Sequence, residues 1–270
     1  MDIWPFFVAV LFKIVMNQSI IFSAISDLHI TGPQDPAYAL LLKFLNSPEV
    51  SISQEIFLLG DIFDVMIGDL PEYLSLYDSF FKKTQQLLDE KKTIHFFEGN
   101  HDFHLRRLFH RAFCQRPDLI SNFHYYFDGI RREFSGKTYY FGHGDDLLSN
   151  DSFYFLYRTI IRSWPFRLLA EHLLTYQAIN NIAKFLSSSF GKNRRPFDSK
   201  NEKIISHYRR LASDSFQKMK IDTIIIGHSH VMDLAKLRDG QRYINLGHGG
   251  RDKQFLFAEH GNFYLKNLSL

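Results

Sequence analysis

Five short apolar stretches of the chain each end in a polar cluster that combines aspartate or asparagine with histidine. The clusters are Asp27-Leu28-His29, Gly60-Asp61-Ile62-Phe63-Asp64, Gly99-Asn100-His101-Asp102, Gly142-His143-Gly144-Asp145 and Gly227-His228-Ser229-His230. The stretches before them, such as 19–25 (SIIFSAI) and 223–226 (TIII), are rich in β-branched or aromatic residues, which is typical of buried strands. Ligands of α/β sheets bind beyond the carboxyl ends of the strands. The sequence therefore predicts an α/β fold with a site where these strands end.

The remaining patterns indicate a layered arrangement around one domain. Further strands are expected at 55–59, 93–97, 232–237, 241–246, 254–258 and 262–265, and helices at 38–45 and 73–91. Two alternating segments, near 124–134 and 137–141, predict a hairpin through Ser135-Gly136. From about 151 to 220 the pattern is helical, which indicates an insertion or cap on the domain formed by residues 17–270.

Composition excludes several classes of protein. A chain of 270 residues with 45% hydrophobic and 23% charged residues is expected to fold. Its single cysteine, Cys114, excludes a disulfide framework and a cysteine-rich zinc site. No apolar run reaches the roughly 18 residues of a membrane span. Residues 1–16 lack the basic start and cleavage site of a secretory signal, so we expect an extension or a mis-assigned start, with translation beginning at Met16.

The polar clusters contain the residue types that bind borderline and hard divalent cations. The candidate ligands are Asp27, His29, Asp61, Asn100, His143, His228 and His230. Imidazole and carboxylate without thiolate suit Mn²⁺ first, with Fe²⁺ or Zn²⁺ as alternatives. Seven ligands exceed one tetrahedral site but suit two ions roughly 3.5–4 Å apart that share a carboxylate. Asp27 and His29 are two residues apart, so in a strand both would lie on one face.

Each histidine taken alone is more often a core or surface residue than a ligand. Recurrence after five successive strands is what favours a metal centre. The histidines outside the five clusters are expected to be structural, except His248, which follows a strand in Gly247-His248-Gly249-Gly250 and stays ambiguous.

The series DLH, GDIFD, GNHD, GHGD and GHSH, in this order, resembles the calcineurin-like metallophosphoesterases. The resemblance implies a four-layer αββα sandwich with a dinuclear centre that hydrolyses phosphate esters. In the ligand sets that it implies, Asp61 bridges the two ions: one is held by Asp27, His29, Asp61 and His230, the other by Asp61, Asn100, His143 and His228.

Residues beside the ligands are expected to support the chemistry. His101 is the candidate to donate a hydrogen bond or a proton to the phosphate or the leaving oxygen. Asp102 is expected to orient His101 or to hold the loop. Asp64 and Asp145 have two roles open to them: fixing a ligand imidazole through its other nitrogen, or capping a turn.

The helical insertion is both apolar and basic. Residues 151–210 contain 11 Lys or Arg against four Asp or Glu, in a chain whose net charge is +3. Such a cap suits acyl chains beside anionic headgroups. Alternatively, its apolar residues pack it onto the core and its bases form a solvated face.

The position of the insertion is similar to that of the helical lid in the UDP-2,3-diacylglucosamine pyrophosphatases of lipid A synthesis. The segment 143–151 (HGDDLLSND) and Asp198-Ser199-Lys200 resemble that family. The resemblance implies hydrolysis of a nucleotide-linked acylated sugar to UMP and 2,3-diacylglucosamine 1-phosphate, by a cytoplasmic protein peripheral to the inner face of the membrane. The residues that it implies for substrate contact are Asn100, His101, Asp151, Lys200 and His228.

One departure leaves other substrates open. That family usually has Arg at the position of His101, and guanidinium and imidazole do different work. The alternatives are a phosphatase or phosphodiesterase for another lipid-linked or soluble ester, and a metal-stabilised binding protein without catalysis. Nucleic acid is not an expected partner, because the basic residues gather in an apolar cap. The sequence implies no protein partner.

Overall fold

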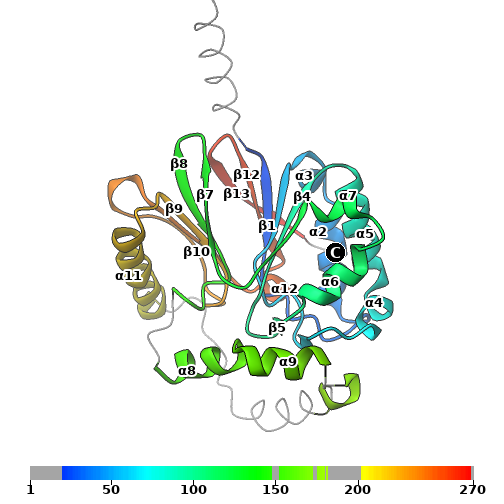
Figure 1. Ribbon diagram of the computed structural model, residues 1–270. Helices are drawn as coiled ribbons and strands as arrows, with labels where there is room; N and C mark the ends of the chain where they lie inside the picture. The colour runs from blue at the N-terminus through cyan, green and yellow to red at the C-terminus, as the bar shows by residue number, and fades with distance from the viewer. Residues whose placement is uncertain (1–19, 148–151, 173–174, 180, 182–201, 269–270) are drawn as a thin grey trace, which may run out of the picture.

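Two β-sheets face each other, with helices on their outer sides (Figure 1). The computed structural model describes residues 20–147, 152–172, 175–179, 181 and 202–268. In sheet order, the first sheet consists of β13 (Asn262–Asn267), β12 (Gln254–Glu259), β1 (Phe22–Ile25), β2 (Glu55–Leu58), β4 (Thr93–Phe97) and β6 (Phe123–Tyr126). The second consists of β10 (Met232–Lys236), β11 (Arg242–Leu246), β9 (Thr223–Ile226), β8 (Lys137–Phe141) and β7 (Ile130–Phe134). A small third sheet pairs β3 (Met66–Ile67) with β5 (Asp102–Phe103).

The strands that precede the polar clusters are parallel neighbours. In the first sheet β1 pairs with β2 and β2 with β4, and in the second β8 pairs with β9. Strand β11 is also parallel to β9. Because parallel neighbours have their carboxyl ends at the same edge of a sheet, the loops that follow these strands gather at one edge of each sheet.

Alternation along the buried strands builds separate core layers. Phe57 of β2 and Ile225 of β9 pack between the two sheets, while Ile56 and Leu58 face the helices outside the first sheet. Ile224 of β9 packs on the other side of the second sheet. Successive side chains of a strand point to opposite faces, so a continuous apolar run can supply two layers at once.

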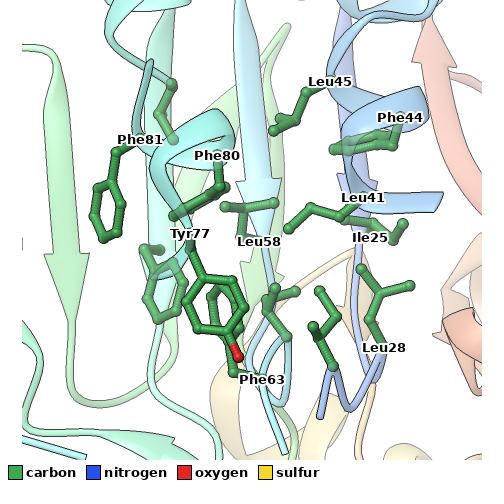
Figure 2. Packing of buried hydrophobic residues seen from close by; sticks show 14 of the residues in the cluster. Ile25, Leu28, Leu41, Phe44, Leu45, Leu58, Phe63, Tyr77, Phe80 and Phe81 are labelled. Atoms are coloured by element: carbon green, nitrogen blue, oxygen red, sulfur yellow. The ribbon is translucent and has the colours of Figure 1, made fainter. Parts of the chain in front are cut away.

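The outer face of the first sheet is covered mainly by α2 (Pro36–Leu45) and α5 (Asp78–Asp89). Figure 2 shows Leu41 of α2 and Phe80 of α5 beside Leu58, with Phe44 of α2 in the same cluster. Asp35 caps α2 by accepting from the backbone N of Ala37. Shorter helices in this half of the chain are α3 (Pro48–Ile52), α4 (Glu72–Leu76), α6 (Arg106–Phe113) and α7 (Pro117–Ile120).

The outer face of the second sheet is covered by α11 (Glu202–Met219), through buried Leu211 and Phe216 (Figure 1). This completes the predicted αββα sandwich, which is confirmed. Helix α11 falls within the range 151–220 predicted for the insertion, yet it forms an outer layer of the sandwich.

Two other helices of the insertion, α8 (Ser152–Ile161) and α9 (Trp164–His172), lie along the end of the sandwich where β5 and the short α12 (Gly249–Asp252) are found (Figure 1). Among the helices that the structure describes, none has the length and apolar character to cross a bilayer.

Several predicted boundaries need correction. The hairpin of β7 and β8 through Ser135-Gly136 is confirmed, but the segment 124–134 is two strands in different sheets. The helix predicted at 73–91 is interrupted at Tyr77 and forms α4 and α5. Residues 1–16 lie outside the described part of the chain.

Candidate metal centre

Four side chains from three loops form the first group of candidate ligands. Asp27 and His29 follow β1, Asp61 follows β2 and His230 follows β9. Each offers one ligand atom, and the four atoms lie within 4.8 Å of one another. The Nε2 atoms of His29 and His230 are 3.0 Å apart, and Nε2 of His230 is 3.2 Å from Oδ1 of Asp27. Two carboxylates and two imidazoles so arranged suit a divalent cation.

A second group lies next to the first and shares Asp61 with it. Nε2 of His143 is 3.0 Å from Oδ1 of Asn100 and 3.2 Å from Nδ1 of His228. Oδ2 of Asp61 is 3.5 Å from Nε2 of His143 and 3.8 Å from Nε2 of His29. One carboxylate oxygen therefore lies between an imidazole of each group, and all seven predicted ligands come together.

The backbone of the ligand loops differs from the expected one. Strand β1 ends at Ile25, so Asp27 and His29 do not continue it, and their φ angles are 52° and 50°. The same left-handed conformation occurs at Asp61 (φ 52°), His228 (φ 66°) and His230 (φ 55°). This conformation costs an L-residue roughly 1–2 kcal/mol. Such strain persists where surrounding contacts impose it, and it gathers at functional sites.

Two glycines allow the loops to approach one another. A Cβ at Gly99 would overlap the backbone nitrogen and the carboxylate of Asp61, and a Cβ at Gly227 would overlap the side chains of Ser26 and Asp27. Any larger residue would push the ligand loops apart. Glycine has no Cβ and is therefore the residue that permits so close an approach.

Asp102 ties two of the ligand loops together. Its buried carboxylate accepts hydrogen bonds from the backbone N–H groups of Asp61 (2.9 Å), Ile62 (2.7 Å), Phe63 (3.2 Å) and Gly99 (3.0 Å). Of the two roles predicted for Asp102, holding the loop is the one observed. The same hydrogen bonds give these backbone N–H groups an acceptor, which they would otherwise lack in the interior.

His101 is paired with Asp64 and lies against the first ligand group. Its Nδ1 donates to the backbone carbonyl of Asp64 at 2.8 Å and is 3.4 Å from the Asp64 carboxylate, and its ring packs edge-on against His29. Burial alone would lower the pKa of His101, but the hydrogen bond to Asp64 and the charge of Asp61 raise it to about 9. With Nδ1 engaged, Nε2 is the nitrogen left to interact with a substrate.

Neighbouring groups fix two of the ligand imidazoles. Nδ1 of His143 is 3.0 Å from the carbonyl oxygen of Leu59, which can only accept, so Nδ1 carries the proton and Nε2 is free to ligate. The Asp64 carboxylate is 3.7 Å from Nδ1 of His29, as expected of a group that orients a ligand. Asp145 accepts instead from Arg158 (2.7 Å) and Arg162 (3.2 Å), and so ties α8 to the ligand loop.

Electrostatics favour the metal-binding form of two of the ligands, Asp27 and His228. Burial would raise the pKa of Asp27, but the hydrogen bond to His230 and the nearby imidazoles hold it well below its usual value. Burial, reinforced by the neighbouring His143, lowers the pKa of His228 to about 4. A carboxylate and a neutral imidazole are the forms that ligate metals.

The structure describes three of the five residues predicted to contact substrate. Asn100, His101 and His228 lie in the site that the structure describes. Asp151 and Lys200 lie outside the described residues, so their roles stay predictions.

His248 joins the site although the sequence left its role open. Its ring centroid is 5.2 Å from that of His29 and 4.9 Å from that of His230. A ring nitrogen from each of these three histidines lies within 4.8 Å of the others. Burial, with His230 and His29 adding to it, lowers the pKa of His248 to about 4. The signal in the sequence was its position after β11, a strand parallel to β9.

Comparison with known proteins identifies the family of the chain. A family model described as calcineurin-like phosphoesterase matches residues 22–232. The UDP-2,3-diacylglucosamine hydrolase of Neisseria gonorrhoeae is 31% identical over 207 residues, 76% of this chain and 80% of that protein. The protein of the same name from Neisseria meningitidis serogroup A is 33% identical over the same shares. The one from Blochmanniella pennsylvanica is 27% identical over 79% of this chain and 80% of its own length. The chain belongs to the calcineurin-like phosphoesterase family.

Proposed function

We propose that the chain is a metal-dependent hydrolase that cleaves the pyrophosphate bond of UDP-2,3-diacylglucosamine, giving UMP and 2,3-diacylglucosamine 1-phosphate. The observation that carries the chemistry is the convergence of seven oxygen and imidazole ligands on two adjoining groups that share Asp61. The proposed substrate rests on the names of two relatives that are 31% and 33% identical to the chain.

The residues present fit two divalent cations. Two imidazole nitrogens 3.0 Å apart, close to the buried carboxylates of Asp27 and Asp61, form a site whose negative charge a cation offsets. Asp27, His29, Asp61 and His230 would hold one ion; Asp61, Asn100, His143 and His228 would hold the other. We propose Mn²⁺ as the first metal to test, with Fe²⁺ and Zn²⁺ as alternatives.

The chain's own residues would act on the phosphate beside these ions. When bound, two such cations supply a nucleophile at neutral pH and neutralise the charge on phosphate oxygens. His101 would donate a hydrogen bond or a proton from Nε2 to the leaving oxygen, with Asp64 holding its other nitrogen. Asn100 and His228 would contact the substrate where the two ligand groups meet. Asp151 and Lys200 would contact it from the insertion.

A second candidate keeps the chemistry and changes the substrate. The pair of His101 and Asp64 provides an imidazole where the pyrophosphatases of lipid A synthesis usually have Arg. An imidazole could protonate a poor leaving group, which guanidinium does not do. This favours a phosphatase or phosphodiesterase acting on another lipid-linked or soluble ester.

We further propose peripheral contact with the cytoplasmic face of the membrane through α8 and α9. Leu156 and Ile160 of α8 and Trp164, Leu168 and Leu169 of α9 are exposed, Trp164 by 70%. Apolar and aromatic side chains on a helix favour burial at a lipid interface. Sedimentation with vesicles containing anionic lipid would detect the contact, and Trp164→Ser should weaken it.

Substrate and chemistry can be tested together. Metal-free protein supplied with Mn²⁺ is expected to release UMP from UDP-2,3-diacylglucosamine, and Asp61→Ala is expected to abolish that release. A metal-loaded protein that hydrolyses bis(4-nitrophenyl) phosphate but leaves the lipid nucleotide intact would favour the second candidate.

A further inference from the structure

His248 lies beside the first ligand group without belonging to either predicted ligand set. It stands on the loop between β11 and α12, half-buried, with its ring packed against those of His29 and His230 at centroid distances of 5.2 and 4.9 Å. A group held by those two imidazoles is therefore within reach of His248.

The loop that carries His248 is held tightly against the loop of Asp27 and His29. A Cβ at Gly249 would come within 2.5 Å of the carbonyl oxygen of Ser26, and one at Gly250 within 2.9 Å of that of Leu28. The backbone N of His248 also donates to the carboxylate of Asp252 at 2.9 Å. The position of His248 relative to the ligand loop is therefore set by backbone packing.

One hydrogen bond defines which ring nitrogen of His248 carries a proton. Nδ1 lies 3.3 Å from the backbone N of Arg251, a group that can only donate, so Nδ1 accepts and caps α12. An imidazole that accepts at Nδ1 is neutral and carries its proton on Nε2. A protonated nitrogen cannot ligate a cation, so this bond makes His248 a donor rather than an eighth ligand.

From this geometry we propose that His248 is a substrate-binding residue that donates its Nε2–H to a phosphate oxygen of the substrate. The inference rests on the proposed function, because it needs an anionic phosphate at the ligand groups. A hydrogen bond to a charged acceptor is stronger than one between neutral groups, so its loss should be measurable.

Two substitutions separate this role from the helix cap. In His248→Asn the amide oxygen can still accept from Arg251, but the side chain is too short to place a donor where Nε2 was. In His248→Gln the longer side chain can place its amide N–H donor near the position of Nε2. We expect His248→Asn to raise KM for the lipid nucleotide, and Kd for inorganic phosphate, by about 10-fold or more. We expect kcat to change little. The KM and Kd of His248→Gln should be closer to those of the unmodified protein, and those of His260→Asn, an exposed control, should equal them.

Metal content provides a readout that does not depend on turnover. The inference predicts two metal ions per chain in both His248 variants, measured by elemental analysis. A fall to one ion would show that His248 is a ligand, and unchanged KM and Kd in His248→Asn would reduce it to a helix cap; either result overturns the inference. If the protein does not cleave the lipid nucleotide, the proposed function fails, but phosphate affinity and KM for bis(4-nitrophenyl) phosphate still test His248.

Discussion

The Nε2 atoms of His29 and His230 lie 3.0 Å apart, although the two histidines are 201 positions apart in the chain. The buried carboxylates of Asp27 and Asp61 lie close to the same pair. A cation would interact with both carboxylates and both imidazoles, and only the folded chain brings these four groups together. Folding and metal binding should therefore be coupled.

Removing the metal is expected to lower the thermal stability of the protein. A ligand that binds only the folded state stabilises it by about 2.7 kcal/mol when its concentration is 100 times Kd. The melting temperature should fall after treatment with a chelator and recover on addition of Mn²⁺. Asp61→Asn should shrink this recovery, because Asp61 touches both groups. A melting temperature that changes neither with the chelator nor with Mn²⁺ would argue against the metal site.

Replacing His101 by Asn should reduce kcat by about 10²- to 10⁴-fold. The amide nitrogen of Asn can still donate to the carbonyl of Asp64, so the loop should keep its shape while Nε2 is lost. If His101 donates a proton, the loss should be larger for a substrate with an alkoxide leaving group than for a nitrophenyl ester. Equal losses for the two substrates would indicate a hydrogen bond without proton transfer.

Replacing Asp102 by Asn should lower the free energy of unfolding by about 2–3 kcal/mol. The amide keeps one accepting oxygen, and its NH₂ group would face backbone N–H groups that now donate to the carboxylate. Urea unfolding measures the change. Asp89→Asn, at an exposed ion pair with Arg116, is the control and should change stability by less than about 0.5 kcal/mol. Equal effects of the two substitutions would contradict the role given to Asp102.

Stability should fall as the pH drops below about 6.5, in part because of His95. This histidine is fully buried, stacked on Phe57 at a centroid distance of 4.4 Å, and hydrogen-bonded to Glu55. Burial is the largest effect on its pKa and lowers it, although Glu55 acts in the opposite direction. The unfolded chain therefore binds the proton first as the pH falls, whereas above the unfolded pKa both states are neutral.

The pH dependence of unfolding tests this directly. His95→Gln should show a shallower loss of stability between about pH 7 and pH 5 than the unmodified protein. His260→Gln, at an exposed position, should keep the original slope. Identical slopes for His95→Gln and the unmodified protein would contradict a lowered pKa.

The gathering of the ligands within each sheet was predictable because it depends on the parallel pairing of the strands. Runs such as 55–58 and 93–97 are too apolar and β-branched or aromatic to lie outside a buried sheet, and parallel pairing brings their carboxyl ends to one edge. Asp61 and Asn100 then become neighbours, whichever conformation their loops adopt. The layered fold follows from the same patterns.

Backbone conformation within the loops was not predictable in the same way. The spacing rule that placed Asp27 and His29 on one face assumes an extended strand, but both residues are left-handed. In the segment 124–134 the alternation runs through a change of sheet at Asp128-Gly129, which only the glycine signalled. Helix α11 has the same amphipathic pattern whether it covers a sheet or a lid, so its sequence could not distinguish the two.

The left-handed backbone at the ligand positions has a consequence for protein engineering. Glycine adopts that conformation without strain. In metal-free protein, His29→Gly or His230→Gly should therefore raise the free energy of unfolding by about 1 kcal/mol while removing an imidazole. A laboratory selection for heat tolerance of the metal-free protein would thus favour inactive sequences at these positions. Libraries built on this scaffold need a screen for turnover at every round.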